Sequence, residues 1–428
     1  MILKLRKIGS IILLSTVSVC ASFIDIYAPA GEAKSCSTYI PSILKQAYIH
    51  YPSITASQKL VLSAKAQIEA AKWNYFPTPS IDFSQGTAGR RGETYRIDQP
   101  LWTGGKIDAL NDMAYARGDE ATYTLGESAY DLSQKVLNVL SSYIQADGEI
   151  KAFQKGKEDL ETLAKMLNRR VGAGVSSESD EELIRSRIFQ IEGDLLTAKR
   201  RYEMAKSQLE LLTGKKMRCG VVFKKDVVLK HKMRYEQLEK QMLVTHPTLK
   251  KKRSQVKIAK AEKKNTDAQI MPNISLRGEY QHGSLYTNDP VNNEAIAYVA
   301  VSFNPGAGLS SLSNMESAQY KVLQAQDDLR TSEQQLKDKL VQDYADYASA
   351  QSRLESVQHM IVSSQKVLES YKRLFLAGKR QWLDLVNASR EVTMNHVTLA
   401  SLRASLIVSA YRIALEAGKL HIDPKGRW

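Results

Sequence analysis

Hydrophobic and polar residues alternate in four short stretches of the chain. In the first stretch, Ile81 and Phe83 fall on one side of an extended chain and Asp82 on the other. Alternation with a period of two is typical of a β-strand with one apolar and one polar face. The sequence therefore predicts four strands, at residues 80–84, 95–101, 273–280 and 299–303.

Charged residues occupy the polar side of these predicted strands, at Asp82, Arg96, Asp98, Arg277 and Glu279. An antiparallel sheet packed on an ordinary core is one interpretation. Apolar-out, polar-in strands are also the signature of an outer-membrane β-barrel, and four strands are too few to close one. Beyond the N-terminus no segment has a long uncharged apolar run, so a membrane role requires these strands. Three copies of the chain would then supply 4 × 3 = 12 strands.

A second pattern predicts helices too long for a compact domain. No proline interrupts residues 107–171, and about 65 residues at 1.5 Å each give roughly 100 Å of helix. A similar stretch follows at 310–377. The segment after the first long helix has apolar residues in alternating steps of four and three, as in an antiparallel coiled coil. These residues are Ile184, Ile188, Ile191, Leu195, Ala198, Tyr202, Ala205, Leu209 and Leu212. Shifted by 204 residues, the pattern persists with polar interruptions at Asn395, Ser409 and Glu416.

The chain contains an internal repeat. Pro52 and Pro77 bracket one helical stretch, and Pro247 and Pro272 bracket another 195 residues later. The motif Arg-x4-Gly-x5-Asp ends at Asp180 and again, 204 residues later, at Asp384. We expect a first unit at 34–215, a linker at 216–240 and a second unit at 241–428. The glycines of the motif, Gly174 and Gly378, predict turns between long helices, and both aspartates are expected in the first turn of the returning helix.

The N-terminus has the pattern of a secretory signal peptide. Lys4, Arg6 and Lys7 precede an apolar run, and small-residue cleavage sites follow up to Ala33. We therefore assign residues 1–33 to a signal peptide, with an uncleaved anchor as the alternative. Export to an oxidising compartment would permit a disulfide between Cys36 and Cys219, but spacing alone leaves this pairing open.

Three motifs in this order resemble the TolC family of trimeric outer-membrane efflux and secretion channels. The first is a short helix at 42–47 that leads to Tyr51-Pro52 and is mirrored at His246-Pro247. The second is the stretch 99–105, where a strand meets its long helix, and the third is the pair of Gly-x5-Asp turns. The resemblance covers the whole mature chain. It implies a β-barrel in the outer membrane of a Gram-negative bacterium, continued by an α-helical barrel in the periplasm.

The resemblance also implies roles for residues near the turns. Asp384 corresponds to a ring of acidic residues that closes the pore, and Asn387 stands where the family can have a second aspartate. Arg380 corresponds to a basic residue that stabilises the closed state. The turn that docks a periplasmic adaptor corresponds to Gly174, Val175 and Ser176, with Asp180 and Gly378 nearby. The implied partners are a homotrimer, an adaptor (membrane fusion) protein, an inner-membrane ABC or RND-type pump and outer-membrane lipid.

The sequence shows no pattern of catalysis. Its seven histidines have no HExxH or metal-ligand spacing, so we predict neither an enzyme nor a cofactor. The net charge of +14 and the basic stretch 250–264 could indicate nucleic acid, but a signal peptide argues against it, and a solvated helix face is the simpler interpretation. We predict a passive export duct. The turn sequence AGVSSESD favours type I protein secretion, with multidrug efflux as the near alternative and a periplasmic coiled-coil scaffold or adaptor as an alternative of another class.

Overall fold

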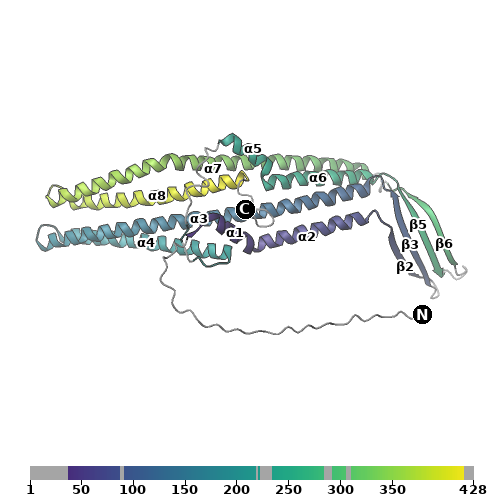
Figure 1. Ribbon diagram of the computed structural model, residues 1–428, viewed down its shortest axis with the longest axis horizontal. Coiled ribbons are helices and arrows are strands. Elements are labelled where there is room, and N and C mark those ends of the chain that lie inside the picture. Colours follow the sequence, from purple (N-terminus) through teal and green to yellow (C-terminus); the bar gives the residue numbers. More distant parts are fainter. Residues whose placement is uncertain are drawn as a thin grey trace, which may run out of the picture.

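The computed structural model describes residues 37–86, 91–217, 220–221, 234–283, 292–304 and 310–418. Long helices run along the longest axis of the molecule, and a small sheet continues them at one end (Figure 1). The opposite end, which we call the tip, consists of two helical hairpin turns. The predicted signal peptide and both cysteines of the predicted disulfide, Cys36 and Cys219, lie outside the described residues.

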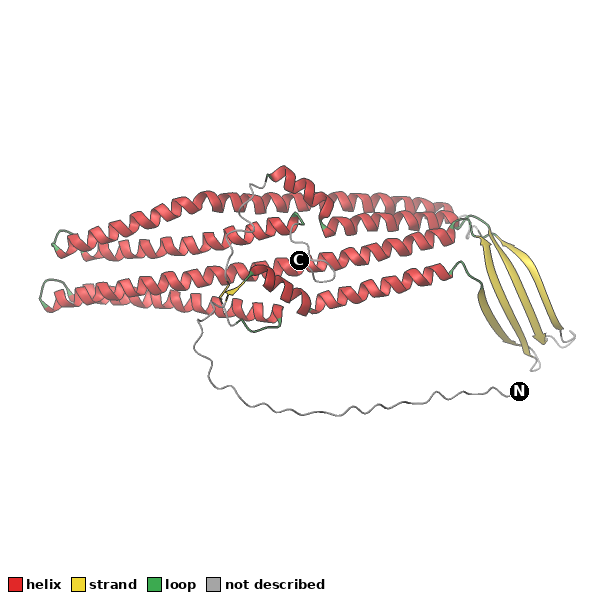
Figure 2. Cartoon of the chain, in the orientation of Figure 1, coloured by secondary structure: helices red, strands yellow, loops and turns green. Residues whose placement is uncertain are grey.

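Helices make up most of the chain, and they occur as two matching sets (Figure 2). The first set is α1 (Ile40–His50), α2 (Pro52–Trp73), α3 (Lys106–Gly172) and α4 (Glu178–Thr213). The second set is α5 (Tyr235–Thr245), α6 (Pro247–Ala268), α7 (Ser310–Leu376) and α8 (Trp382–Glu416). The paired helices have 11, 22 and 67 residues in both sets, and the last pair has 36 and 35. The predicted repeat and the two long helices are confirmed. Helix α5, the counterpart of α1, begins inside the stretch 216–240 that the sequence assigned to a linker.

The sheet consists of one antiparallel hairpin from each half. Its strands are β2 (Thr78–Gln85), β3 (Arg91–Trp102), β5 (Asn273–Gly283) and β6 (Asn292–Ser302), in the order β2-β3-β5-β6. A separate pair of two-residue strands, β1 (Ser37–Thr38) and β4 (Gly220–Val221), runs parallel near the middle of the molecule. The predicted fold class, mainly α with four amphipathic strands in two repeats, is confirmed.

The helices form a layer in which α3 is central. At the sheet end α3 contacts α2 and α6, and at the tip end it contacts α4 and α8, while α7 contacts α6 and α8. Two glycines let α8 approach α3 closely. A Cβ atom at Gly148 would lie 2.4 Å from the Cβ of Ala400, and one at Gly156 would lie 2.4 Å from Oγ1 of Thr393. At the tip end the four helices therefore follow one another across the layer in the order α4, α3, α8, α7.

The predicted heptad positions form the contact between the helices of each hairpin. In α4 six of the nine predicted residues are buried and the others are half-buried. In α8 all nine are buried, including the polar residues that interrupt the pattern. Asn395 donates a hydrogen bond from Nδ2 to Oγ of Ser364 on α7 (3.1 Å), so its polarity is satisfied inside the layer.

Helix α8 is the one described helix with the length and composition of a membrane-crossing segment. Within its most apolar window, 61 % of the residues are buried against other parts of the chain. Such burial is typical of a core helix, and α8 lies between α7 and α3 in the layer.

Candidate functional site

The two turns at the tip are built alike. Gly174 and Gly378 have positive φ angles of 72° and 70°, a conformation that favours glycine. In the first turn the amide of Val175 donates to the carbonyl of Arg170 (2.8 Å), and in the second the amide of Lys379 donates to that of Leu374 (2.9 Å). These bonds across five residues, with Gly174 and Gly378 in the left-handed position, end both helices in the same way. The predicted turns are confirmed.

Each predicted aspartate lies at the third position of a returning helix. The amide of Asp180 donates to Oγ of Ser177, which caps α4 (3.3 Å). Asp384 has the same place in α8, but the residue before that helix, Gln381, makes no side-chain cap. Carboxylates in a first helical turn are stabilised by the helix dipole. This capping position is sufficient to explain Asp180, which forms no described ion pair.

Arg380 and Asp384, both assigned to the predicted gate, contact each other within one hairpin. Arg380 Nη1 lies 3.2 Å from Oδ2 of Asp384, and its guanidinium stacks 4.5 Å from the ring centroid of Tyr371. All three residues belong to α7, α8 or the turn between them. Asn387 is exposed one turn further along α8 and has no described bond to the other two. The described chain therefore holds Arg380 against its own hairpin.

A different set of residues joins the two hairpins near the tip. The guanidinium of Arg170, at the end of α3, lies 4.6 Å from the ring centroid of Phe375, at the end of α7. Beside it an apolar cluster is shared by both hairpins: Leu160, Leu163, Leu167, Ile184 and Ile191 from the first, and Phe375, Trp382, Leu385 and Val386 from the second. No local pattern in the sequence predicts this contact. The one feature that sets Phe375 apart is that the repeat offset of 204 places an aromatic ring where the first half has Val171.

The sheet at the other end separates apolar from charged residues, as predicted. The register pairs Ile81 with Tyr95 and Tyr95 with Tyr280 on one face. This face also contains Phe83, Ile97, Leu276, Val299 and Val301, and every one of these side chains is exposed. An apolar face of this size that packs on nothing is unusual in a water-soluble chain.

The opposite face of the sheet is a network of ion pairs. Arg96 lies 3.6 Å from both Asp82 and Glu279, on the two neighbouring strands. Nε of Arg277 donates to Oδ1 of Asp98 at 2.6 Å. The five charged residues predicted to share a face are therefore side by side. Charged groups on one face and exposed apolar groups on the other are what a barrel with a polar interior requires.

Buried and half-buried ionisable residues also come together at mid-length, where α3, α6, α7 and α8 meet. We call them the waist cluster: Tyr130, His246, Lys339, Asp343, Arg412 and Glu416. Lys339 lies 3.8 Å from Glu416 and donates to the hydroxyl of Tyr130 at 2.7 Å. Arg412 lies 3.5 Å from Asp343. Glu416 is completely buried, and both of its carboxyl oxygens lack a hydrogen-bond partner within the described chain.

The surroundings of this cluster shift its protonation. Burial, followed by the neighbouring carboxyl of Asp343, raises the pKa of Glu416 to about 8. Burial, with the positive charge of Lys339 as a smaller cause, lowers the pKa of His246 to about 4. At neutral pH we therefore expect a protonated Glu416 and an uncharged His246 whose Nδ1 accepts from the amide of Thr248 (3.3 Å).

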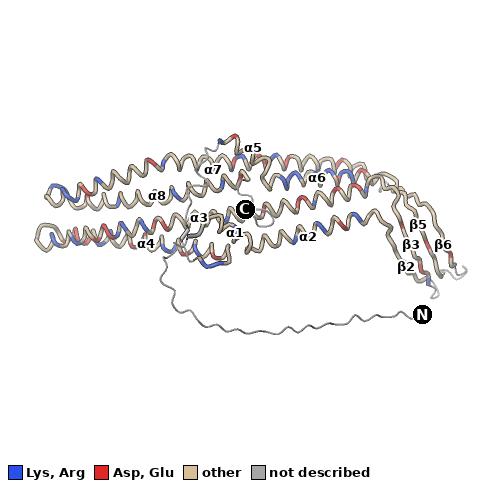
Figure 3. Tube along the Cα trace, viewed as in Figure 1, with Lys and Arg blue, Asp and Glu red and all other residues tan. Residues whose placement is uncertain are grey.

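The basic stretch of α6 lies along the acidic side of α3 (Figure 3). Four ion pairs cross between the helices: Lys251–Glu127 (2.6 Å), Lys257–Asp119 (3.5 Å), Lys264–Asp112 (2.9 Å) and Arg117–Glu262 (3.4 Å). The stretch is thus partly neutralised within the chain rather than simply solvated. Among the described residues no group of histidine, cysteine and acidic side chains could hold a metal ion.

Comparison with protein families gives one extended match. The model of a family described as outer membrane efflux protein matches residues 43–215 and 238–418, so both repeats are included. None of the curated proteins compared with the chain matches it.

Solved structures of outer-membrane channels share the fold. CusC is 15 % identical with a TM-score of 0.77, over 91 % of this chain and 95 % of that one. VceC from Vibrio cholerae is 14 % identical with a TM-score of 0.74, over 89 % of this chain and 95 % of that one. CmeC from Campylobacter jejuni is 12 % identical with a TM-score of 0.72, over 96 % of both chains. With both repeats matched by the family model, the chain belongs to the outer membrane efflux protein family, the family of TolC-like channels.

Proposed function

We propose that this protein is the outer-membrane duct of a tripartite export system and that it conducts cargo passively through a homotrimer. Members of the family are trimeric channels of the Gram-negative outer membrane with a periplasmic helical tunnel, and they work with adaptors and inner-membrane pumps. The observation that carries the proposal is the sheet. It has an exposed apolar face, a charged opposite face and two unpaired edge strands, β2 and β6.

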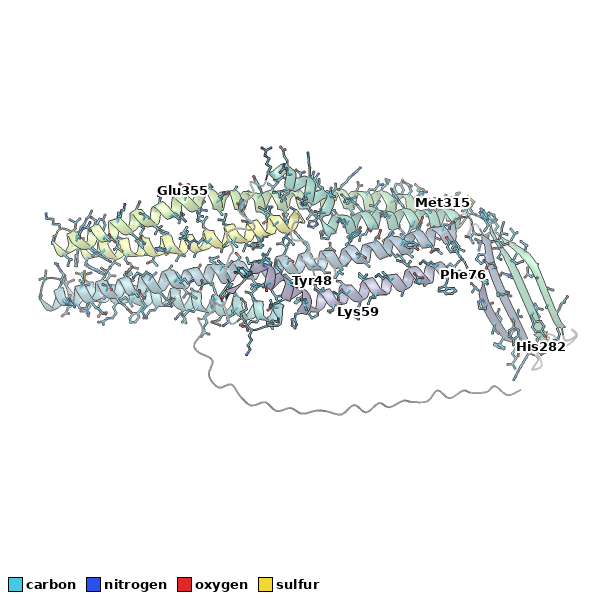
Figure 4. The ribbon with its side chains drawn as sticks, in the orientation of Figure 1. Tyr48, Lys59, Phe76, His282, Met315 and Glu355 are labelled. Atoms are coloured by element: carbon cyan, nitrogen blue, oxygen red, sulfur yellow. The ribbon has the colours of Figure 1, made fainter. Side chains whose placement is uncertain are left out.

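The edges of the sheet support assembly from several copies. In lipid, unpaired backbone groups of β2 and β6 would be costly, and pairing β6 of one copy with β2 of the next removes both edges. Aromatic residues lie where the helices meet the sheet, as at a membrane–water interface. Trp73, Phe76, Trp102 and Phe303 are all exposed there, and Figure 4 places Phe76 at this junction and His282 towards the far end of the sheet.

The helical layer supports the same assembly. Helices α4 and α7 are its two edges at the tip end, and both expose apolar residues. On α4 they include Phe189, Leu196, Met204 and Leu211, and on the tip half of α7 they include Met360, Val362, Val367 and Leu376. Because the two edges differ, copies would join head to tail, and such contacts close into a ring.

The first experiment tests the duct itself. The protein, expressed with its own N-terminus, should fractionate with the outer membrane, run as a trimer in native mass spectrometry and form channels in planar bilayers. A periplasmic scaffold or adaptor would instead wash off with salt and form no channel. A fully water-soluble monomer would overturn the proposal.

We further propose that Asp384 forms the constriction at the tip, with Arg380 and Asn387 beside it, and that Gly174, Val175 and Ser176 dock the adaptor. Three carboxylates around one axis would favour cations and divalent block. We expect Asp384→Ala to raise conductance and remove block by divalent ions, whereas Asp180→Ala, at the matched position of the first hairpin, leaves both unchanged. Unchanged conductance and block in Asp384→Ala would remove the gate assignment.

The cargo class is the finer part of the proposal. The turn sequence of residues 173–180 favours protein cargo delivered by an ABC-type pump, and the family description favours small-molecule efflux. Crosslinking in cells, followed by identification of the copurifying inner-membrane partner, separates the two. An ABC protein with a secreted polypeptide supports secretion, and an RND-type pump supports efflux.

A further inference from the structure

A small cavity lies between the hairpins just above the tip. Residues of α3, α4 and α8 enclose a volume of about 170 Å³. Its walls are apolar and include Phe153, Leu160, Ile191, Val386 and Met394. A cavity of about 150 Å³ with similar walls is large enough to hold one benzene ring. The space therefore fits a single aromatic ring and little more.

Polar side chains also line this cavity. They include Arg187, Asn387 and Arg390 together with one carboxylate, Asp194, so the charged side chains of the lining carry a net positive charge. Arg187 donates to Oε1 of Gln190 at 3.0 Å, while Arg390 forms no ion pair with any described residue. A guanidinium without an acidic partner is available to a carboxylate, which it binds through two parallel hydrogen bonds.

From the apolar volume and the unpaired guanidinium we propose that the cavity is a binding site for a small aromatic carboxylate. The ring lies against the apolar side chains, and the carboxylate lies against the exposed Arg390. A neutral aromatic molecule would fill the same volume but lose the charge-assisted bonds. The site therefore discriminates by charge rather than by size.

The cavity lies on the same face of α8 as Asp384. Asn387 and Met394 follow Asp384 at helical spacing, so the three side chains form one stripe. If Asp384 lines the pore, which rests on the proposed function, a molecule in the cavity sits on the pore wall above the constriction. Cargo or blockers of this chemistry would then contact the channel here.

The test measures binding to the assembled channel in lipid nanodiscs by saturation-transfer NMR, with benzoate and its neutral counterpart benzamide as probes. We expect a benzoate Kd on the order of 1 mM and about tenfold weaker binding of benzamide. Arg390→Ala should weaken benzoate binding about tenfold without changing benzamide binding. Arg403→Ala, an exposed arginine of the same helix outside the cavity, is the matched control.

Equal affinities of benzoate and benzamide would overturn the proposal. So would an equal loss of benzoate affinity in Arg403→Ala and Arg390→Ala, because general attraction to a basic chain would then explain the binding. Conductance gives a second readout. Benzoate should reduce single-channel current in the unaltered protein but not in Arg390→Ala. If benzoate binds but does not change the current, the binding site stands and its location on the pore wall is wrong. A failure of the Asp384→Ala test alone leaves the binding result standing, so the two proposals fail separately.

Discussion

The hairpins α3–α4 and α7–α8 have nearly the same helix lengths and the same type of turn, yet their returning helices are buried to very different extents. Helix α4 packs on α3 and exposes apolar residues such as Phe189 and Leu196 on its other side. Helix α8 packs on both α7 and α3, and 21 of its 35 residues are buried, against 7 of 36 in α4. One duplicated unit therefore serves as an edge in the first half and as the interior of the layer in the second.

The waist shows the same divergence at matched positions. In the first half Tyr51, Val139 and Leu212 pack against an apolar core cluster. Their repeat counterparts in the second half are His246, Asp343 and Glu416, all buried in the waist cluster. Matched backbone positions therefore hold an apolar core in the first half of the protomer and ionisable side chains in the second. The edge of α4 and the waist cluster should therefore respond to different perturbations.

The largest effect is expected at the edge of α4. In Phe189→Glu/Leu196→Glu, two side chains that are 65 % and 57 % exposed in the single chain become charged. Their exposure predicts little change in the fold of one copy. In the trimer each loses apolar burial of about 1.5–3 kcal/mol and introduces an unpaired charge, so association should weaken by more than about 5 kcal/mol. Native mass spectrometry in detergent should show monomers.

The control for this variant is Glu203→Gln, which changes an exposed charge on the same helix. It should remain trimeric. If the double variant also forms trimers, the exposed face of α4 is not a contact between subunits.

The next effect is a pH dependence of stability that belongs to the second half. Because the pKa of Glu416 is raised from 4.5 to about 8, the folded state binds more protons across that range, and stability falls as pH rises through it. His246, with its pKa lowered from 6.5 to about 4, has the opposite sign, since stability falls as pH drops through that window. The two trends oppose each other between pH 4.5 and 6.5, so the decline above pH 6.5 is due to Glu416.

Glu416→Gln, a neutral residue of the same shape, should remove that decline and raise stability at pH 8.5 by on the order of 3 kcal/mol per protomer. Denaturant unfolding between pH 6 and 9 measures it. Leu212→Gln, at the matched position of the first half, should destabilise equally at every pH. A pH profile that Glu416→Gln leaves unchanged would show that Glu416 is ionised throughout.

Local patterns and long-range contacts differed in how far the sequence could predict them. The long helices and the Gly-x5-Asp turns follow from proline-free periodic stretches and from glycine at left-handed positions, both of which act over a few residues. Strand β6 begins at Asn292 rather than near Val299, because pairing with β5 extends it through residues without clear alternation. Glu416 was a polar break in a heptad pattern. Its burial beside Asp343 depends on which faces of α7 and α8 meet, and no local signal encodes that.

A smaller effect is expected where the two hairpins touch. Phe375→Leu keeps most of the apolar volume in the shared cluster but removes the ring that Arg170 stacks on, a contact worth about 0.5–2 kcal/mol. If opening separates the hairpins, open probability in planar bilayers should rise about two- to thirtyfold. Arg380→Gln, which disturbs contacts inside the second hairpin only, is the comparison. A larger rise in open probability in Arg380→Gln would show that Arg380, as the family resemblance implies, stabilises the closed state more than the contact between Arg170 and Phe375 does.

The smallest effect is expected at the first turns of α4 and α8, where the matched N-cap residues differ in whether their side chain caps the helix. Ser177 caps α4 by accepting from the amide of Asp180, whereas Gln381 leaves the same position of α8 without a side-chain cap. Ser177→Ala should destabilise the first turn of α4 by about 1 kcal/mol, and Gln381→Ser should stabilise that of α8 by about 0.5–1 kcal/mol. Hydrogen exchange of the amides of Asp180 and Asp384 measures both changes locally. Helix α8 is held along its length by burial, whereas α4 is an edge helix. The faster exchange caused by Ser177→Ala should therefore extend over more residues of α4 than the slower exchange caused by Gln381→Ser extends over α8. Changes that extend equally far in both helices would show that burial does not determine the local stability of the two helix starts.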